Sequence, residues 1–246
     1  MIKEENKQNL IFYSLLTLIV GILMYVSNTL SISYKEALNV FENSSLLTYV
    51  TKVSLYIFGQ IDLALRVSFI LFYALSVILM YKLTKNYFRF EKDRLITICL
   101  FMILPGVLSA SLLVNSSIIV IFFTLLYIYL FRYKNDYSYL LMVVLLFVDN
   151  SFAILYLAMF IYAFKNEDKR TLIFSGVFFI LSLILYGFET SGKPKGYFLD
   201  TFAIYATVFS PLLFIYFVYT IYRVGIKEEK TLIWYISTTA IILSLL

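Results

Sequence analysis

The sequence contains no histidine and a single cysteine, Cys99, among its 246 residues. The absence of histidine excludes Ser-His and Cys-His catalytic pairs and removes the commonest zinc ligand. One cysteine excludes a disulfide within the chain and a thiolate cage around a metal. No glycine-rich loop that could cradle a phosphate is present either, so chemistry driven by ATP is not expected. Any catalysis must come from carboxylates, lysines, arginines or tyrosines.

Charged residues are also scarce, at 14% of the chain, whereas 62% of residues are hydrophobic and 19% are aromatic. Water-soluble domains are usually about 45–50% apolar and about 25% charged. The composition therefore excludes a water-soluble globular domain. It also excludes intrinsic disorder, which requires low hydrophobicity and high net charge. The length is better counted in membrane crossings of about 20 residues each.

The charge-free stretches predict about nine hydrophobic segments, two of them short. Residues 95–131 are 37 residues long, about twice one crossing, so we expect Asn115-Ser116-Ser117 to turn them into a hairpin. Pro105 predicts a kink in the first arm of that hairpin. The nine segments are 10–26, 67–81, the two arms of 95–131, the two arms of 137–164, 171–188, 201–222 and 231–246.

The two short segments come from residues 137–164, which Asp149-Asn150 divides into arms of 12 and 14 residues. Basic residues flank both ends of this stretch, so both ends are expected on the cytoplasmic side. Asp149 and Asn150 then form a polar site within the membrane. If the tip reaches the surface, they are ordinary turn residues instead.

Basic residues are distributed unevenly between the two sides that these crossings define. With the N-terminus in the cytoplasm, the cytoplasmic segments carry 15 basic and 9 acidic residues, and the outer segments carry 5 and 6. The net charge of +5 is therefore a topology signal, and no nucleic-acid partner is expected. We predict a multi-pass protein of a bacterial-type inner (plasma) membrane, with the lipid bilayer as its surroundings.

Residues 29–62 form a long outer segment between the first two crossings. Apolar residues recur there every three or four positions, at Leu46, Val50, Val53 and Ile57. This stripe, with Lys52 and the serines opposite, predicts a helix lying in the plane of the membrane interface. Asp62 is expected to cap the next helix and to pair with Arg66, four residues later.

We therefore predict an all-α, polytopic transmembrane helix bundle with an outer helical platform. Residues 1–246 would form a single integral membrane domain, and residues 29–62 its extracytoplasmic juxtamembrane loop. The sequence leaves the oligomeric state open. Nothing polar follows the segment 231–246, as expected of a chain shortened from a longer protein.

The order of one crossing, an outer platform and a bundle is accompanied by two local patterns. They are the stretch from Leu55 to Arg66, with Phe58-Gly59 inside it, and Leu104-Pro105-Gly106 followed by Asn115. In these features the first two-thirds of the chain resemble the polytopic GT-C glycosyltransferases. That class contains the dolichyl-phosphate-mannose protein mannosyltransferases and the bacterial aminoarabinose lipid A transferase. The resemblance implies transfer of a sugar from a polyprenyl-phosphate donor to an acceptor on the outer side of the membrane.

In that family an acidic residue at the start of the outer platform acts on the acceptor, commonly within an Asp-Glu pair followed by a small residue. The matching residues here are Lys35-Glu36-Ala37, so the second acid is kept and Lys35 replaces the first. The resemblance implies Glu36 as the catalytic carboxylate, with Glu42 as the alternative. Read without the resemblance, both glutamates are solvated residues of an interfacial helix.

A departing lipid phosphate needs cations, which Arg66, Lys193 and Lys195 could supply. Each also has a simpler interpretation. Arg66 would anchor a helix end at the lipid headgroups, and the two lysines would be ordinary loop charges. No cofactor is identifiable from the sequence, and no cluster of metal ligands supports a divalent ion.

The replacement by Lys35 keeps a non-catalytic alternative open. The chain could be a scaffold subunit of an envelope complex that has kept the fold without the reaction. A transporter is the third hypothesis, because it requires polar residues at the middle of the bilayer and only the region of Asp149 fits.

Overall fold

The structure is a computed structural model of the chain that describes residues 2–41, 46–59, 61–85, 87–88, 90–187, 198–227 and 230–245. Over these ranges the regular structure is helical, without a strand, which confirms the predicted all-α class. The chain divides into two compact units, Met1–Tyr129 and Leu130–Leu246. Each unit is considered by itself below.

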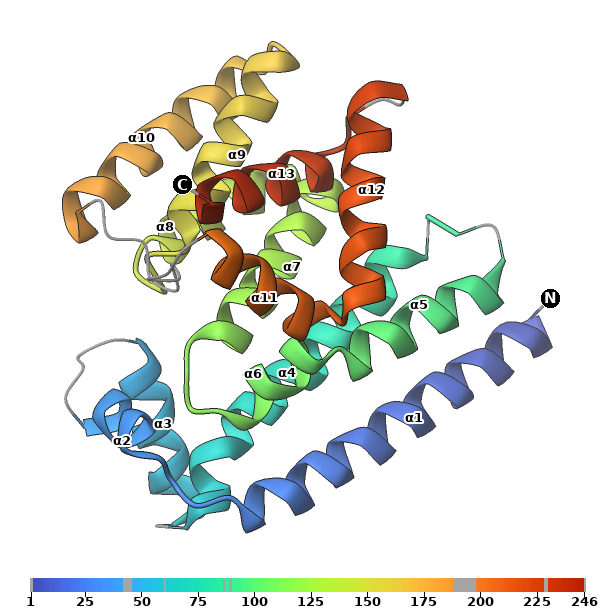
Figure 1. Cartoon of the computed structure of the whole chain (residues 1–246), viewed down its shortest axis with the longest axis vertical. Coiled ribbons are helices and arrows are strands. Elements are labelled where there is room, and N and C mark those ends of the chain that lie inside the picture. The colour runs from blue at the N-terminus through green and yellow to red at the C-terminus, as the bar shows by residue number, and fades with distance from the viewer. Residues whose placement is uncertain are drawn as a thin grey trace. The chain divides into compact units, whose positions relative to one another are not determined.

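The first unit is organised around one helix, α4, which contacts α1, α3, α5 and α6. In Figure 1, α2 and α3 lie near the start of α4, beside the end of α1 that is remote from the N-terminus. The helices are α1 (Ile2–Thr29), α2 (Tyr34–Phe41), α3 (Leu46–Phe58), α4 (Asp62–Thr84), α5 (Glu91–Ile103), α6 (Pro105–Leu112) and α7 (Ser117–Tyr133), the last of which continues into the second unit.

The kink predicted at Pro105 is confirmed. α5 ends at Ile103, α6 begins at Pro105, and the two helices are bent by 49°. Proline lacks an N–H and disfavours the helical conformation of the residue before it, here Leu104. Tyr73 of α4 donates a hydrogen bond of 2.9 Å to the carbonyl of Met102, one of the carbonyls that the end of α5 leaves without a helical partner.

The second unit is built around α9, which packs against α10 and α13. α8 contacts α10, and α12 contacts both α11 and α13. The helices are α8 (Asn135–Leu145), α9 (Phe152–Lys165), α10 (Lys169–Tyr186), α11 (Phe198–Phe209), α12 (Pro211–Lys227) and α13 (Leu232–Leu245).

By length and composition, three helices of the described chain could each cross a membrane: Lys7–Thr29, Asp62–Thr84 and Lys169–Tyr186. The number rises to five if each of two bent helix pairs forms one span. Those pairs are Glu91–Ile103 with Pro105–Leu112, and Ala203–Phe209 with Pro211–Lys227. All nine predicted segments contain helix, but nine crossings stay a prediction.

The segment 201–222, predicted as one hydrophobic segment, is sharply bent. α11 ends at Phe209, α12 begins at Pro211, and the pair is bent by 104°. Between them Ser210 has a φ of 66°, in the left-handed region. Pro211 explains the break, because a proline disfavours the right-handed helical conformation at the preceding residue.

A buried arginine, Arg94, binds the C-terminal end of α4. Arg94 of α5 donates to the carbonyl of Tyr81 at 2.7 Å and to the carboxylate of Glu91 at 2.8 Å. Its guanidinium carbon lies 3.8 Å from the centroid of the Tyr81 ring, and Phe12 of α1 stacks on that ring at 3.9 Å between centroids. These contacts fasten α1, α4 and α5 to one another.

We expect Arg94→Ala to lower the free energy of unfolding by about 2–3 kcal/mol, because the Tyr81 carbonyl loses a charged donor and the ring loses its cation. Thermal unfolding followed by circular dichroism in detergent would measure the change. Lys92→Ala, at an exposed position of the same helix, is the matched control and should stay within about 0.5 kcal/mol of wild type. Equal losses in both variants would show that the Arg94 contacts contribute nothing specific.

Candidate functional site

The helical platform formed by α2 and α3, which the sequence predicts on the outer side, begins with a capping box made by Ser33 and Glu36. The Ser33 N–H and hydroxyl both donate to Oε2 of Glu36, each at 2.8 Å. The Ser33 hydroxyl oxygen also accepts the N–H of Glu36 at 3.3 Å. A serine followed three residues later by a glutamate satisfies free N–H groups at a helix start in this way. This capping box fixes the beginning of α2. Its sequence signal is the spacing of Ser33 and Glu36, which the sequence analysis missed.

The other oxygen of Glu36 reaches two more segments of the chain. Oε1 accepts the N–H of Val114, in the turn after α6, at 2.9 Å, and Nη2 of Arg66 at 3.4 Å. A carboxylate offers about four lone-pair sites. The four donors supplied by Ser33, Val114 and Arg66 occupy them, two on each oxygen, and Glu36 is only 6% exposed.

Arg66, near the start of α4, is the centre of this cluster and is 1% exposed. Besides Glu36, its guanidinium donates to main-chain carbonyls, most of which lie at or just after the C-terminal ends of α1 and α6. Its positive charge also complements the negative ends of those helix dipoles. The carbonyls belong to Leu30 at 2.7 Å, Leu112 at 2.8 Å, Ser31 at 3.2 Å, Ser27 at 3.4 Å and, on its own helix, Asp62 at 3.5 Å.

The two roles predicted for Asp62, capping α4 and pairing with Arg66, are both wrong. α4 starts at Asp62 itself, Ile61 takes the cap position, and no side chain caps the helix. The ion pair of Arg66 is with Glu36, and only the main-chain carbonyl of Asp62 contacts the guanidinium. An exposed pair within one turn engages one partner, whereas the buried position lets Arg66 satisfy several carbonyls and a carboxylate together.

The electrostatics of Glu36 favour its ionised form. Burial raises the pKa of the carboxyl. The hydrogen bonds from Ser33 and Val114 and the charge of Arg66 together lower it by more than burial raises it, so the pKa lies below its ordinary value. An ionised carboxylate that already accepts four hydrogen bonds binds a further proton weakly. The arrangement is suited to holding three segments of chain together.

The structure thus brings two of the candidate residues, Glu36 and Arg66, into direct contact across 30 residues of sequence. Lys35, which replaces the family's first acid, is exposed on α2. Glu42, Lys193 and Lys195 lie outside the described residues. The catalytic role of Glu36 and the phosphate-binding role of Arg66 and the two lysines stay predictions.

Asp149 and Asn150 lie in the turn between α8 and α9, as predicted for the tip of a pair of short helices. Asp149 Oδ1 accepts the N–H of Ser151 at 2.8 Å, which is the hydrogen bond of an Asx turn. Both tip residues are half-buried. Asp149 therefore has a local structural role in the turn.

Two contacts with α10 show how far the hairpin tip reaches. At the start of α10, Arg170 pairs with Asp136 of α8 at 2.9 Å. At its end, Tyr186 donates to the carbonyl of Leu146, just after α8, at 3.0 Å. α8 and its turn therefore run alongside α10 from one end to the other. α10 is long enough to cross a membrane, and the tip of the hairpin lies at the end of α10 remote from Asp136.

Among the described residues, no three His, Cys, Asp or Glu side chains are grouped so that they could hold a metal ion. Comparison of the chain with family models, with curated proteins and with solved structures gives no match.

The lowered pKa of Glu36 predicts how stability depends on pH. A folded pKa below the unfolded value, about 4.3 for glutamate, means that the stabilisation is complete above the unfolded pKa and is lost as pH falls through the folded one. We expect Glu36→Gln to be less stable than wild type at pH 7, by about 3 kcal/mol, because Arg66 loses its buried anion. The difference should shrink below about pH 4.

Thermal unfolding midpoints of both proteins in detergent, measured from pH 7 down to pH 3, would show this convergence. Asp62→Asn removes an exposed carboxyl from the same neighbourhood and should follow the wild-type curve. Parallel curves for wild type and Glu36→Gln would contradict the stabilising role of the Glu36 charge.

Proposed function

We propose that this chain is a multi-pass membrane protein with a cytoplasmic N-terminus that transfers a sugar from a polyprenyl-phosphate donor to an acceptor on the outer side of the membrane. One observation supports this more than any other. The resemblance to GT-C glycosyltransferases rests on residues 35–37, 55–66 and 104–115. These three stretches meet at one buried cluster, in which Glu36 contacts both Arg66 and the N–H of Val114. These stretches are separate in sequence, and their convergence gives the platform a defined place beside the crossings.

The chemistry of such a donor suits this arrangement. Its polyprenyl tail lies in the bilayer and its phosphate at the interface, where the departing group needs cations and the acceptor hydroxyl needs a carboxylate. Lys193 and Lys195, which follow α10 in the sequence, are the proposed phosphate ligands. Glu36 orders the platform in the resting arrangement, and it becomes a proton acceptor only by exchanging one of its four hydrogen bonds for one from the acceptor.

A specific observation also favours the non-catalytic alternative, a scaffold subunit of a membrane complex. All four lone-pair sites of Glu36 are occupied, and Lys35 stands where the family commonly has an acid. On this proposal the cluster serves only to attach the platform. Membranes that contain the wild-type chain would then transfer no more sugar than membranes without it.

Sugar transfer by membranes carrying the wild type, Glu36→Gln or Ser33→Ala tests the role of Glu36. If the carboxylate accepts the acceptor's proton, Glu36→Gln should reduce kcat by roughly 10²–10⁴-fold. Ser33→Ala is the matched control, because it removes the hydroxyl that donates to the Glu36 carboxylate and accepts the Glu36 N–H, but keeps the carboxylate. It should cost about 1 kcal/mol of stability and leave most of the transfer.

Unfolding midpoints measured on the same samples separate the two roles of Glu36. A loss of transfer that simply follows the loss of stability in both variants would assign Glu36 a positioning role. Unchanged transfer by a well-folded Glu36→Gln protein would remove it from the catalytic machinery.

A further inference from the structure

The α3 helix of the platform turns its polar side inward. Thr48, Thr51 and Ser54 are each at most 4% exposed and belong to the side that faces the protein. Their hydroxyls are accommodated by the backbone: Thr51 donates to the Leu47 carbonyl at 3.0 Å, and Ser54 donates to the carbonyl of Ala64 on α4. Through Ser54, this buried hydroxyl side joins α3 to the start of α4.

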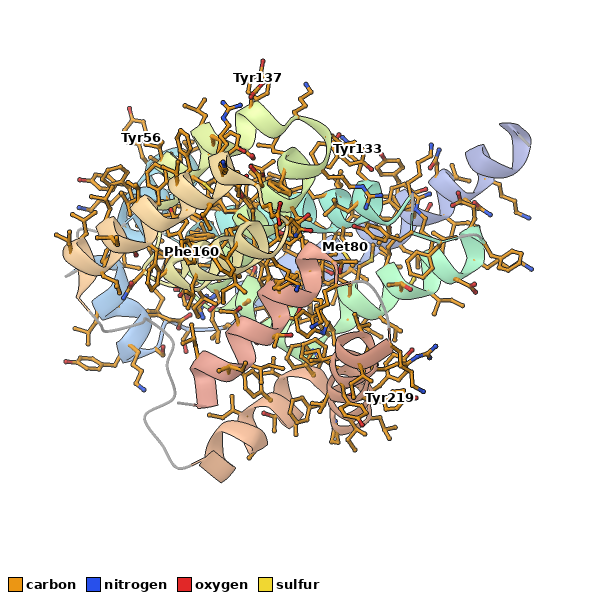
Figure 2. All side chains as sticks on the ribbon, turned by 90° about the horizontal axis from the view of Figure 1, so that it is seen from above. Tyr56, Met80, Tyr133, Tyr137, Phe160 and Tyr219 are labelled. Atoms are coloured by element: carbon orange, nitrogen blue, oxygen red, sulfur yellow. The ribbon has the colours of Figure 1, made fainter. Side chains whose placement is uncertain are left out.

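The opposite side of α3 carries large apolar and aromatic side chains that no part of its own unit covers. Tyr56, labelled in Figure 2, is 91% exposed. In water a surface helix buries its apolar face and exposes its polar one, so α3 has the reverse arrangement. The exposed side chains on this side are Tyr49, Val53, Tyr56 and Ile57, and we call them the aromatic face of α3. Phe58, at the end of the helix, is exposed as well.

The exposed side of α3 differs from the apolar stripe that the sequence predicts. The predicted stripe included Leu46 and Val50, which the structure places at the half-buried edges of α3. The exposed face centres instead on Tyr49 and Tyr56, with Lys52 between them along the helix. Two tyrosines and one lysine combine apolar bodies with polar tips, which is the chemistry of the membrane–water interface.

The position of α3 in the chain indicates what covers this face. α3 ends at Phe58, where Gly59 follows with a φ of 87°. α4, long and apolar enough to cross a membrane, begins close by at Asp62. Ile61, directly before α4, is also exposed. The aromatic face is therefore continuous, through Ile61, with the point where a crossing would enter the bilayer.

We propose that the aromatic face of α3 docks on the phospholipid bilayer at the level of the outer-leaflet headgroups, with Lys52 beside the lipid phosphates. This inference rests on the membrane topology proposed above. The hydrogen bond from Ser54 to the Ala64 carbonyl and the burial of Thr48 and Thr51 fix the rotation of α3, so the tyrosines and Val53 stay directed at lipid. The platform is then supported from two sides, by the Glu36–Arg66 cluster within the protein and by the bilayer beneath α3.

Spin labels on single cysteines in proteoliposomes test this docking. The chain has one native cysteine, Cys99, so a Cys99→Ser background accepts one label at a time. The test positions are Val53→Cys and Tyr56→Cys, on the aromatic face. Leu71→Cys, an exposed position within α4, is the control for lipid, and Asp136→Cys, exposed at the start of α8, is the control for water.

Collision rates with oxygen, which concentrates in lipid, and with a water-soluble nickel chelate are then compared by power saturation. Positions 53 and 56 should show more oxygen and less chelate than position 136, and a shallower depth than position 71. High chelate accessibility at 53 and 56 would place the face in water and overturn the inference. Low accessibility to both reagents would mean that protein, such as a second copy of the chain, covers it, and this would overturn it as well.

The control at Leu71 separates this inference from the proposed topology. If position 71 reports lipid and positions 53 and 56 do not, the docking of α3 fails while the membrane crossing stands. If position 71 reports water, the topology itself fails and the docking fails with it. Circular dichroism of each labelled protein confirms that the cysteine substitution has kept the helical fold.

Discussion

The burial of Arg66 is the constraint on which the first unit depends. An ionised guanidinium can leave water only when its N–H groups are paired, since an unpaired buried charge is strongly destabilising. Here the partners are the carboxylate of Glu36 and carbonyls at the ends of α1 and α6. Because these groups come from separate segments, pairing the N–H groups of one side chain fixes the relative positions of α1, the platform and the kinked α5–α6 pair.

A second buried arginine is paired less completely at the other end of α4: the terminal nitrogens of Arg94 have partners, but its Nε has none among the described residues. Arg94 donates to the carbonyl of Tyr81, near the C-terminal end of α4, and its guanidinium lies over the ring of that tyrosine. Between the two arginines α4 buries apolar side chains such as Phe69 and Val77, which are fully enclosed. α4 is thus held by an arginine at each end. Arg66 binds carbonyls at the ends of α1 and α6, and Arg94 binds a carbonyl in the last turn of α4 itself.

This arrangement changes the role expected of Glu36. A general base needs a free lone pair near its substrate, and the four hydrogen bonds of Glu36 leave none in the resting structure. Its position at the start of the platform agrees with the resemblance, while its bonding is that of a structural acid. The proposed function therefore turns on whether an acceptor can displace the Ser33 hydroxyl.

Some features could be predicted from the sequence because their causes are local. The apolar segments became helices, and Pro105 bent one of them, since proline acts on the residues next to it. The capping box at Ser33 was equally local, although its use in binding Arg66 was not. The break at Ser210 shows that local chemistry indicates where a helix ends better than how far the next one turns.

Composition and hydrophobic pattern by themselves determined that this protein is helical and rich in segments able to cross a membrane. Only the tertiary structure decided that Arg66 pairs with Glu36 and not with Asp62, and that α3 turns its hydroxyl groups toward α4. Both outcomes depend on which distant groups lie within about 3 Å of a side chain. Such proximity is set by packing, and periodicity along one helix does not encode it.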